Sequence, residues 1–560
     1  MTDTLADVEQ LLDRARSAYD DDPAVGALLE DLAERLHEPL RVALAGMMKA
    51  GKSTLLNAVI GEEIAPTDTG ECTRIVTWYR WSATPRITLH RTDGGQVLLP
   101  VRRVAGRLQF DLGGLRSDEV HRLVVEWPAE SLRHLTLIDT PGIASLSTDL
   151  SERSLRLLTP EDRASEADAV IYLMRHLHAS DLDFLEAFRD DSTGSSGTVN
   201  ALAVLSRADE VGAGRIDSLI SAAGIADRYR ADPTLRALAL DVVPVAGLLA
   251  QSSRTLRQEE FGALAALAAL DRPTREKLLL SADRFVRPDA GLQVDAALRA
   301  SLLDRFGVFG IRLACALLRG GVATSSELAV ELARRSGLDQ LLQLVERQFR
   351  ARSDQLRART ALQAVRDLVL AHPTPQDRSL LGSIERIEAG AHQIRELRLL
   401  SALRSRAVPL GAGDARDAER LIGGSGVTAA RRLALGDDAA GEEVASTALA
   451  ELRRWRLVAE NPLTDRGALE ACQVVIRSCE QLLRDVRPAE PSASGTGPAA
   501  SGPVRDRGVA GLPEPARGGG QESDEQGRGS QDRLDHEEHE RELETAGVVR
   551  EERRRQKHRA

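Results

Sequence analysis

The stretch that decides the fold of this chain is Gly46-Met47-Met48-Lys49-Ala50-Gly51-Lys52-Ser53. It fits the Walker A pattern G-x-x-x-x-G-K-[ST], in which backbone N–H groups surround nucleotide phosphates, the lysine reaches the β- and γ-phosphates and the hydroxyl binds Mg²⁺. The apolar run at 40–45 predicts a buried parallel strand before the loop, and residues 53–60 predict a helix after it, whose N-terminal dipole favours phosphate. The stretch therefore predicts an α/β domain that binds a nucleotide.

Lysine is scarce in this chain. There are four lysines among 74 basic residues, and two of them, Lys49 and Lys52, lie inside the loop. An ammonium group is a compact charge that fits under a phosphate chain, whereas a planar guanidinium does not fit the same loop. The two lysines therefore mark a chemical need, and Lys52 is the predicted phosphate ligand.

The composition is that of a large globular protein. With 560 residues, 42% hydrophobic and 28% charged, the chain can form two or three domains. The formal charge of −11 argues against a nucleic-acid-binding surface, because phosphate backbones attract basic patches. Four cysteines do not make a disulfide framework, and Cys472 and Cys479 on one apolar helical stripe are predicted to be buried thiols. With no signal peptide and no apolar run of membrane-span length, a cytoplasmic location is expected.

The apolar pattern divides the chain into regions. Residues 3–38 predict two amphipathic helices with a break at Pro23, and residues 40–250 alternate strand-like and helix-like runs, as in a mostly parallel α/β domain. Beyond residue 250 only helical patterns occur. They predict a long helix over 338–369, another over 384–397 and a last one over 469–486.

Helices at both ends of a nucleotide domain must cover their apolar stripes. We therefore expect the N- and C-terminal helices to form a single bundle, with those of 3–38 packed on those ending at Val486. The expected regions are N-terminal bundle helices at 1–39, a nucleotide-binding head at 40–335, a C-terminal helical bundle or stalk at 336–487, and a disordered tail at 488–560.

A second motif ends the predicted strand at 134–139. Asp139-Thr140-Pro141-Gly142 places a carboxylate at the tip of the strand, where Asp139 can hold Mg²⁺ through water. Gly142 lets a backbone N–H turn onto the γ-phosphate, which makes it a sensor of hydrolysis. The motif is weak alone and strong on the strand that follows a Walker A loop.

A threonine-rich loop lies between these motifs, at residues 66–74, and opens onto the predicted strand at 75–79. A threonine in such a loop closes over Mg²⁺ and the γ-phosphate. Thr73 is the predicted residue because it directly precedes the strand, with Thr67 and Thr69 as alternatives. The other interpretation is that Thr73 is an ordinary residue at the start of that strand.

Recognition of guanine needs a carboxylate for the base N1 and N2 groups and a long side chain over the ring. After the predicted strand at 199–205, Ser206-Arg207-Ala208-Asp209 departs from the usual N-K-x-D or T-K-x-D. Asp209 can still pair with guanine, and Arg207 can lie over the base where lysine would; a plain turn at a strand end is the alternative. A further strand at 240–245 ends at Ala246-Gly247, where a backbone N–H can meet guanine O6.

The order of these motifs, flanked by helices on both sides, resembles the bacterial branch of the dynamin-like large GTPases, and within it the isoniazid-inducible group of actinobacteria. The resemblance covers roughly residues 5–485. The narrower match is carried by the stretches Arg41–Gly46, Ile64–Asp68, Thr73–Trp78, Val125–Glu130, Ser206–Glu210, Asp283–Arg287 and Ile422–Gly426.

Membership of that family would imply a dynamin-type GTPase head on a helical stalk, with GTP or GDP and Mg²⁺ as cofactors. It would also imply a homodimer or oligomer formed through the heads, a possible second dynamin-like partner, and binding or remodelling of an anionic membrane at the inner face of the plasma membrane. No nucleic-acid partner is expected. The implied nucleotide contacts are Gly46, Met47, Met48, Lys49, Ala50, Gly51, Lys52, Ser53, Thr54, Ser206, Arg207 and Asp209; the implied catalytic residues are Lys49, Lys52, Thr73 and Gly142; and the implied metal ligands are Ser53, Thr73 and Asp139.

The chain departs from the family pattern at two places. Eukaryotic dynamins carry Gln and Ser where this loop has Met48 and Lys49. Met48 cannot orient water, which predicts slow hydrolysis, and Lys49 either stabilises charge between the β- and γ-phosphates or is a solvated loop residue. No long apolar insertion is evident that would serve as a membrane paddle.

Two other functions fit the same head. One is a slowly hydrolysing, nucleotide-dependent scaffold or regulatory GTPase that acts through a protein partner without remodelling membranes. The other is a ribosome-assembly GTPase, which is disfavoured because no basic RNA-binding domain follows the head.

Overall fold

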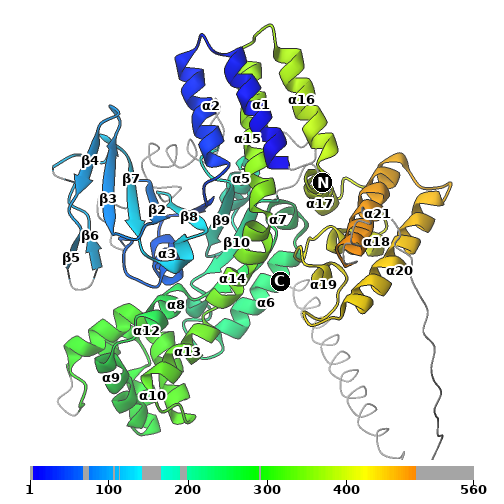
Figure 1. The fold of residues 1–560 in the computed structure, drawn as a ribbon. Helices are drawn as coiled ribbons and strands as arrows, with labels where there is room; N and C mark the ends of the chain where they lie inside the picture. Colours follow the sequence, from blue (N-terminus) through cyan, green and yellow to red (C-terminus); the bar gives the residue numbers. More distant parts are fainter. Residues whose placement is uncertain are drawn as a thin grey trace, which may run out of the picture. The chain divides into compact units, whose positions relative to one another are not determined.

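The Walker A loop joins strand β1 (Leu40–Gly46) to helix α3 (Lys52–Ile60), as the sequence predicts. The computed structural model (Figure 1) describes residues 4–66, 75–104, 107–112, 114–141, 165–188, 199–288 and 292–486. All of them belong to one unit, Met1–Ala489. Thr67, Thr69, Thr73 and Gly142 of the predicted site lie outside the described residues.

The described residues form a nine-stranded sheet in the order β11-β10-β9-β1-β8-β2-β7-β3-β4. β1 lies between β8 and β9 and pairs with both in parallel, and β10 and β11 continue the parallel half. β2 runs antiparallel to β8 and begins the mixed half. The predicted mostly parallel sheet is confirmed. The strands are β1, β2 (Thr77–Trp81), β3 (Arg86–Arg91), β4 (Gln96–Leu99), β7 (Val120–Trp127), β8 (Leu135–Asp139), β9 (Ala169–Met174), β10 (Ala201–Ser206) and β11 (Val242–Val245), with a separate hairpin of β5 (Arg102–Val104) and β6 (Arg107–Gln109).

Helices cover both faces of the parallel half. Side chains alternate along a strand, so Val42 and Leu44 of β1 face one layer and Ala43 and Ala45 face the other. The first layer contains α3, α8 and α14, and the second contains α5, α6 and α7. The helices of the head and of the helical region that follows it are α5 (Ala179–Ala187), α6 (Ser218–Ala231), α7 (Pro233–Leu238), α8 (Gly247–Arg254), α9 (Gln258–Ala269), α10 (Arg272–Leu278), α11 (Ala282–Val286), α12 (Ala296–Arg319), α13 (Ser325–Arg335) and α14 (Leu338–Leu344).

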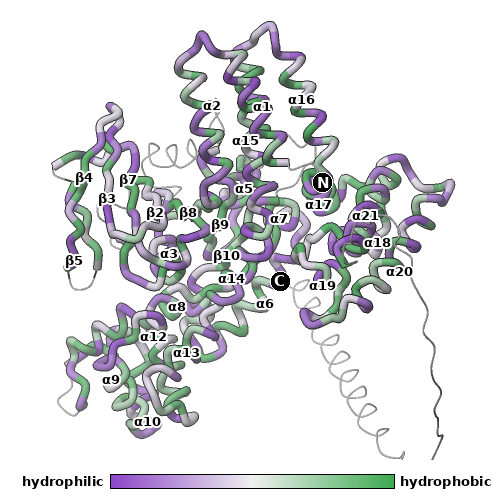
Figure 2. The backbone as a smooth tube through the Cα atoms, in the orientation of Figure 1, coloured by the Kyte–Doolittle hydropathy of each residue, from purple (hydrophilic) through white to green (hydrophobic). Residues whose placement is uncertain are grey.

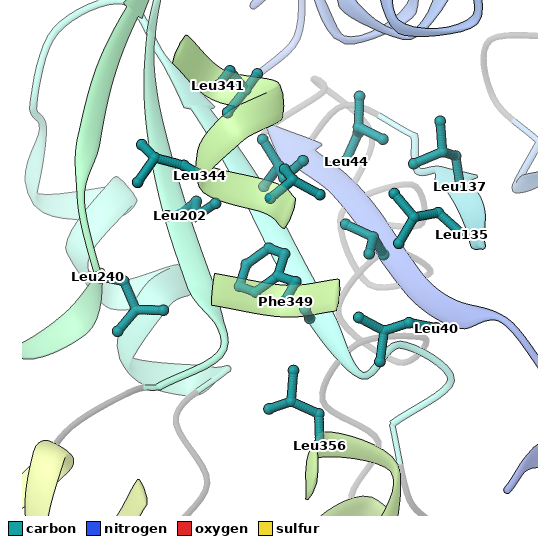
Figure 3. Close-up of a cluster of buried hydrophobic side chains, with 14 of the residues drawn as sticks. Leu40, Leu44, Leu135, Leu137, Leu202, Leu240, Leu341, Leu344, Phe349 and Leu356 are labelled. Atoms are coloured by element: carbon teal, nitrogen blue, oxygen red, sulfur yellow. The ribbon is translucent and has the colours of Figure 1, made fainter. Parts of the chain in front are cut away.

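The predicted single helix over 338–369 is wrong. α14 is followed by a π-helical turn at Val345–Phe349, a 3₁₀ turn at Arg350–Arg352 and then α15 (Ser353–Ala371). The apolar stripe continues through the interruption, because Leu341, Leu344 and Phe349 pack against the sheet. Figure 3 shows these side chains gathered with those of Leu40, Leu44, Leu202 and Leu240.

The N-terminal helices α1 (Thr4–Ala18) and α2 (Pro23–Arg35) share a core with α15 and α16 (Asp377–Gly390). Hydrophobic and hydrophilic residues alternate along α1, α2 and α16 (Figure 2), as expected of helices with one buried side. A bundle of N- and C-terminal helices is therefore confirmed. Its predicted pairing with the helix that ends at Val486 is wrong, because an amphipathic stripe does not specify which of several apolar helices will cover it.

The last helix belongs to another group. α21 (Arg466–Val486) forms a hairpin with α20 (Gly441–Glu460) and packs on α17 and α18. Cys472 and Cys479 are buried free thiols in its core, as predicted. The remaining helices are α17 (His392–Arg404), α18 (Ala412–Leu421) and α19 (Ala429–Arg432). The predicted helix over 384–397 is divided at Ala391 between α16 and α17.

A buried ion pair fastens the N-terminal helices to the head. Arg35 of α2 places Nη2 2.6 Å from Oδ1 of Asp168, which directly precedes β9. Asp168 Oδ2 accepts a hydrogen bond of 2.9 Å from the backbone N–H of Arg41 in β1. The carboxylate thus joins a bundle helix to two adjacent strands.

Candidate nucleotide-binding site

Glycine is required at the entrance of the Walker A loop. Gly46 has a φ of +143°, and a Cβ there would lie 2.3 Å from the carbonyl oxygen of Leu173 in β9. Gly51 has a φ of +95° and starts α3. Lys49, which is not a glycine, also lies in the left-handed region with a φ of 62°. The loop therefore has a positive φ at three positions between the end of β1 and the N-terminus of α3.

Lys52 is held inside the loop. Its Nζ donates to the carbonyl oxygens of Gly46 at 3.0 Å and Met47 at 3.3 Å, and the side chain is buried. Burial lowers the pKa of Lys52, and the neighbouring Asp139 carboxylate opposes that shift. A buried ammonium with few neighbouring anions would be stabilised by a further negative charge, and a bound phosphate group would supply it.

Ser53 and Asp139 meet although 86 residues separate them. Ser53 Oγ donates to Asp139 Oδ2 at 3.0 Å. Asp139 Oδ1 is buried and has no hydrogen-bond partner among the described residues. Burial raises the pKa of the Asp139 carboxyl, while the charge of Lys52 and the Ser53 hydroxyl lower it. A hydroxyl beside a carboxylate with an unused buried oxygen fits the hard oxygen ligands that Mg²⁺ prefers.

Ser206–Asp209, the guanine-type motif of the sequence analysis, forms the turn after β10. Arg207 adopts a φ of 53° and precedes a 3₁₀ turn at Ala208–Glu210. Asp209 is 6% exposed, and burial raises its pKa to about 6. Ser206 Oγ donates to the carbonyl oxygen of Met174 at 3.1 Å, which fixes the end of β10 against β9.

A cavity of about 110 Å³ lies between this turn and the start of α3. The lining residues are Ala50, Gly51, Thr54, Leu55, Leu173, Val204, Ser206, Arg207, Asp209, Glu210, Val245, Gly247 and Leu248. Six of the sequence-predicted contacts therefore meet here, together with Gly247, where a backbone contact to the base was expected.

Arg207 links the two motifs. Its Nη2 donates to the carbonyl oxygen of Lys49 at 2.9 Å, and its Nη1 lies 2.6 Å from Glu210 Oε1. Glu210 in turn pairs with Arg175 at 2.8 Å. The turn that carries Asp209 is thereby attached to the loop that carries Lys52.

Sequence reasoning missed several residues of this cavity. Leu248 lies one position beyond the Ala246-Gly247 strand end, and Glu210 directly follows the predicted motif, so both had a signal nearby. Gly307 had none. It interrupts α12 with a φ of 63° and a ψ of 172°, and a Cβ on it would lie 3.8 Å from Asp209 Oδ2. Its backbone therefore packs beside the buried carboxylate.

The sheet brings a phosphate loop, a hydroxyl–carboxylate pair and a cavity of nucleobase size to the carboxyl ends of neighbouring parallel strands. This is the arrangement of the P-loop GTPase class.

Sequence comparison narrows the class. Residues 42–192 match the Dynamin family. Over 472 residues the chain is 46% identical to the isoniazid-induced protein IniC of Mycobacterium tuberculosis, with 84% of this chain and 95% of that protein covered. The chain belongs to the bacterial dynamin-like GTPases, close to IniC.

Two further similarities are weaker. The bacterial dynamin-like protein of Nostoc punctiforme is 32% identical over 114 residues, which cover 18% of this chain and 16% of that protein. A solved structure described as an oligomerised bacterial dynamin pair for long-range sensing and tethering of membranes has 12% identity and a TM-score of 0.29, with 83% of this chain and 87% of that chain covered. Within the described part of this chain, no helix has the length and apolar character needed to span a membrane.

Proposed function

We propose that the chain binds GTP with Mg²⁺ and hydrolyses it to GDP. The observation that carries this proposal is the Arg207–Lys49 hydrogen bond of 2.9 Å. It connects the cavity beside Asp209, where the base would bind, to the Walker A loop, where the phosphates would bind. A bound nucleotide spans both parts at once. The domain division at 1–39, 40–335, 336–487 and 488–560 is part of the same proposal.

The phosphate end of the site is assigned to the loop Gly46–Thr54. Lys52 binds the β- and γ-phosphates, and its two loop carbonyls hold the ammonium in place beforehand. Ser53 and Asp139 hold Mg²⁺, which neutralises phosphate charge. Thr73 and Gly142, in the undescribed segments, stay predictions as the residues that sense the γ-phosphate.

The base end is assigned to Asp209 and Arg207. A carboxylate accepts from guanine N1 and N2, and adenine has no such donors there. Because Asp209 is buried at 6% exposure, its oxygens lack the water contacts that would weaken this discrimination. Arg207 lies over the base, and its hydrogen bond to Lys49 sets the distance between base and phosphates.

A nucleotide titration tests this assignment. The unaltered chain should prefer GTP over ATP, and Asp209→Ala should weaken GTP binding by about 2 kcal/mol, as loss of a charged hydrogen bond does. Asp209→Asn should lose GTP binding and gain binding of xanthosine triphosphate, because an amide N–H complements the 2-oxo group of xanthine. This gain separates a lost contact from a damaged fold. Equal affinity of the unaltered chain for GTP and ATP would sink the assignment.

Self-association and membrane contact extend the proposal. We infer, from membership of the family, that GTP-bound heads associate and that a peripheral membrane contact exists. Leu463, in the turn of the α20–α21 hairpin, is 91% exposed, and the neighbouring Arg466 side chain is exposed to the same extent. An apolar residue beside a basic one is suited to an anionic surface.

Vesicle sedimentation tests the membrane contact. Co-sedimentation with anionic vesicles should occur at low salt, decrease at high salt and increase with a GTP analogue. Leu463→Ser should reduce it, whereas Leu370→Ser, another exposed leucine at 66%, should not. Absence of binding in every condition would favour a partner protein as the membrane anchor.

One observation favours the slowly hydrolysing scaffold as the second candidate. Met48 is 48% exposed in the loop and has no group that can orient water. A chain of this kind would switch by nucleotide exchange and act through a partner. A turnover rate that stays near zero when heads are concentrated on vesicles would support this function over remodelling.

A further inference from the structure

A second cavity, of about 360 Å³, lies between the head and the C-terminal helices. It is bounded on one side by α6, α7 and the start of β11, and on the other by α14, the π-helical turn, α17 and α18 (Figure 1). None of the predicted nucleotide contacts lines it. Its charged lining residues are Arg230, Arg236, Arg347, Arg404, Asp241 and Glu419.

Both carboxylates of this cavity are already engaged. Glu419 binds Arg404 Nη1 at 2.7 Å and also pairs with Arg236. Asp241 accepts from Arg230 Nε at 2.7 Å. Arg230 also pairs with Asp227, which lies outside the lining, so four guanidinium groups face three carboxylates and one positive charge is left over.

Arg404 also has no spare donors. Its Nη2 donates to the carbonyl oxygens of Ala239 at 2.8 Å and Leu240 at 2.7 Å. Its Nε donates to the carbonyl oxygen of Arg236 at 3.0 Å. Arg404 therefore fastens α17 to the end of α7. It shapes the cavity but cannot bind a ligand without breaking these bonds.

Arg347 is the guanidinium that remains. Within the described part of the chain it forms no ion pair, and its Nε is buried without a hydrogen-bond partner. Burial and the neighbouring Arg431 lower its pKa, and the charges of Asp241 and Asp437 oppose that shift. Arg347 lies in the π-helical turn Val345–Phe349, and such turns are frequent at functional sites. The structure thus places in this cavity a guanidinium that forms no ion pair with a carboxylate of the described residues.

A glycine-rich loop completes the wall beside Arg347. Gly424 and Ser425 line the cavity, and neither the N–H nor the hydroxyl of Ser425 bonds to another described residue. Gly426 has a φ of +136°, and a Cβ on it would lie 3.0 Å from Arg431 Cδ and 3.8 Å from Arg347 Cδ. Arginine stems pack on the backbone of this loop at Gly426, and the exposed Ser425 lines the same cavity as Arg347 with its donors open to solvent.

We propose that this cavity binds a small soluble anion that carries a phosphate or diphosphate group, with Arg347 and Ser425 as its ligands. Guanidinium pairs with phosphate through two parallel N–H···O bonds, and a serine hydroxyl adds a third donor. A volume of about 360 Å³ exceeds that of phosphate alone and accommodates a phosphorylated metabolite. The bound anion would join the head to the C-terminal helices.

Calorimetric titration of the full chain with pyrophosphate tests the proposal. The titration uses the Lys52→Ala background, so that the Walker A loop does not contribute to binding. Arg347→Gln should weaken pyrophosphate binding about tenfold or more, as loss of a charge-assisted contact does. Arg347→Lys keeps the positive charge, so its affinity for pyrophosphate should lie between that of the chain with Arg347 and that of Arg347→Gln. The control is Arg350→Gln, which alters the next turn of the same segment at an exposed residue paired with Glu346 at 2.9 Å.

The source of the phosphate is resolved in separate arms. Inorganic phosphate should bind more weakly than pyrophosphate. Vesicles that contain phosphatidic acid should displace no more pyrophosphate than the control vesicles of phosphatidylcholine. No pyrophosphate binding, or equal weakening by Arg347→Gln and Arg350→Gln, overturns the site. Competition by phosphatidic acid vesicles overturns the soluble ligand. Because Lys52 is absent in every arm, the result does not depend on whether the head binds GTP.

Discussion

Arg207 Nη2 lies 2.9 Å from the carbonyl oxygen of Lys49, so a residue of the guanine-type motif holds the backbone of the phosphate loop. Lys49 is also the residue of that loop whose side chain must tolerate a left-handed backbone, with a φ of 62°. The contact is made to the carbonyl, and substitutions of the Lys49 side chain therefore leave it in place. If this site binds GTP as proposed, we expect base recognition and loop geometry to be coupled through this one hydrogen bond.

Arg207→Ala should lower GTP affinity by about 1–2 kcal/mol, because it removes a charged hydrogen bond to the phosphate loop and the cover of the base. Arg207→Lys should lose less, since an ammonium can still donate to the Lys49 carbonyl. Isothermal titration measures both. Arg175→Ala is the control, because Arg175 shares Glu210 at 2.8 Å but does not reach the loop. Equal losses for Arg207→Ala and Arg175→Ala would contradict the coupling.

Asp209 should make both stability and GTP affinity depend on pH. Burial raises its pKa from an ordinary value of 3.8 to about 6. The folded chain therefore binds more protons than the unfolded chain between about pH 4 and pH 6, and stability falls as the pH rises through that window. GTP needs the carboxylate, so its affinity should rise with pH up to about 6 and then level off.

Asp209→Asn removes the buried charge and tests this sign. It should raise the free energy of unfolding by up to about 3 kcal/mol above pH 6 and leave it unchanged near pH 4. Urea denaturation at pH 4, 6 and 8 measures the difference. A variant that is less stable than the unaltered chain at pH 8 would show that the carboxylate is stabilised by its surroundings after all.

The nucleotide site was predictable where its chemistry is local in sequence. Gly46–Ser53 and Ser206–Asp209 each place their groups within one loop, so local patterns indicated both, the second in spite of its departure from the usual motif. The Arg207–Lys49 bond spans 158 residues, and no local pattern encodes it. Gly307 meets Asp209 through an interruption of α12 that helix periodicity does not register.

The helical region was less predictable for a related reason. A stripe of apolar residues reports that one side of a helix is buried, but it does not identify the partner. The stripe through Leu341, Val345 and Phe349 continues across a π-helical turn because both halves face apolar surroundings. In the same way, α1 and α2 could have met any amphipathic helix, and they pack on α15 and α16.

The two loop lysines should separate binding from turnover. Lys52→Ala should abolish GTP binding or turnover, because Lys52 is the cation held by the loop carbonyls. Lys49→Gly should keep binding and lower turnover if the Lys49 ammonium stabilises transferring charge. Glycine is preferred over alanine here because it accepts the positive φ without strain. Unchanged turnover in Lys49→Gly would identify Lys49 as a solvated loop residue.

Deleting residues 1–38 should leave an aggregating chain, because it uncovers the apolar sides of α15 and α16. Deleting residues 490–560, which lie outside the unit Met1–Ala489, should leave folding and GTP binding intact. Size-exclusion chromatography distinguishes the two outcomes. A monodisperse, GTP-binding N-terminal deletion would contradict the shared core.

The Arg35–Asp168 pair predicts a sharper effect from a single substitution. Their side chains are 6% and 0% exposed, and Nη2 and Oδ1 lie 2.6 Å apart. Arg35→Ala leaves the Asp168 carboxylate buried without its counter-charge, which should lower the free energy of unfolding by about 3–5 kcal/mol. Arg16→Ala is the control, because its pair with Asp13 spans 3.5 Å at the surface and should contribute less than about 1 kcal/mol.

A double variant separates the loss of charge pairing from the loss of packing. Arg35→Met together with Asp168→Asn removes both charges and keeps an apolar stem at position 35. Residue 168 can still accept the hydrogen bond from the Arg41 backbone N–H, although more weakly. This variant should recover most of the stability lost in Arg35→Ala, since neutral buried groups avoid the penalty of an unpaired charge. Urea midpoints of the three variants decide the matter. If the double variant is no more stable than Arg35→Ala, the pair acts through its hydrogen bonds to Ser165 and Arg41, and the bundle is fastened to the head by geometry and not by charge.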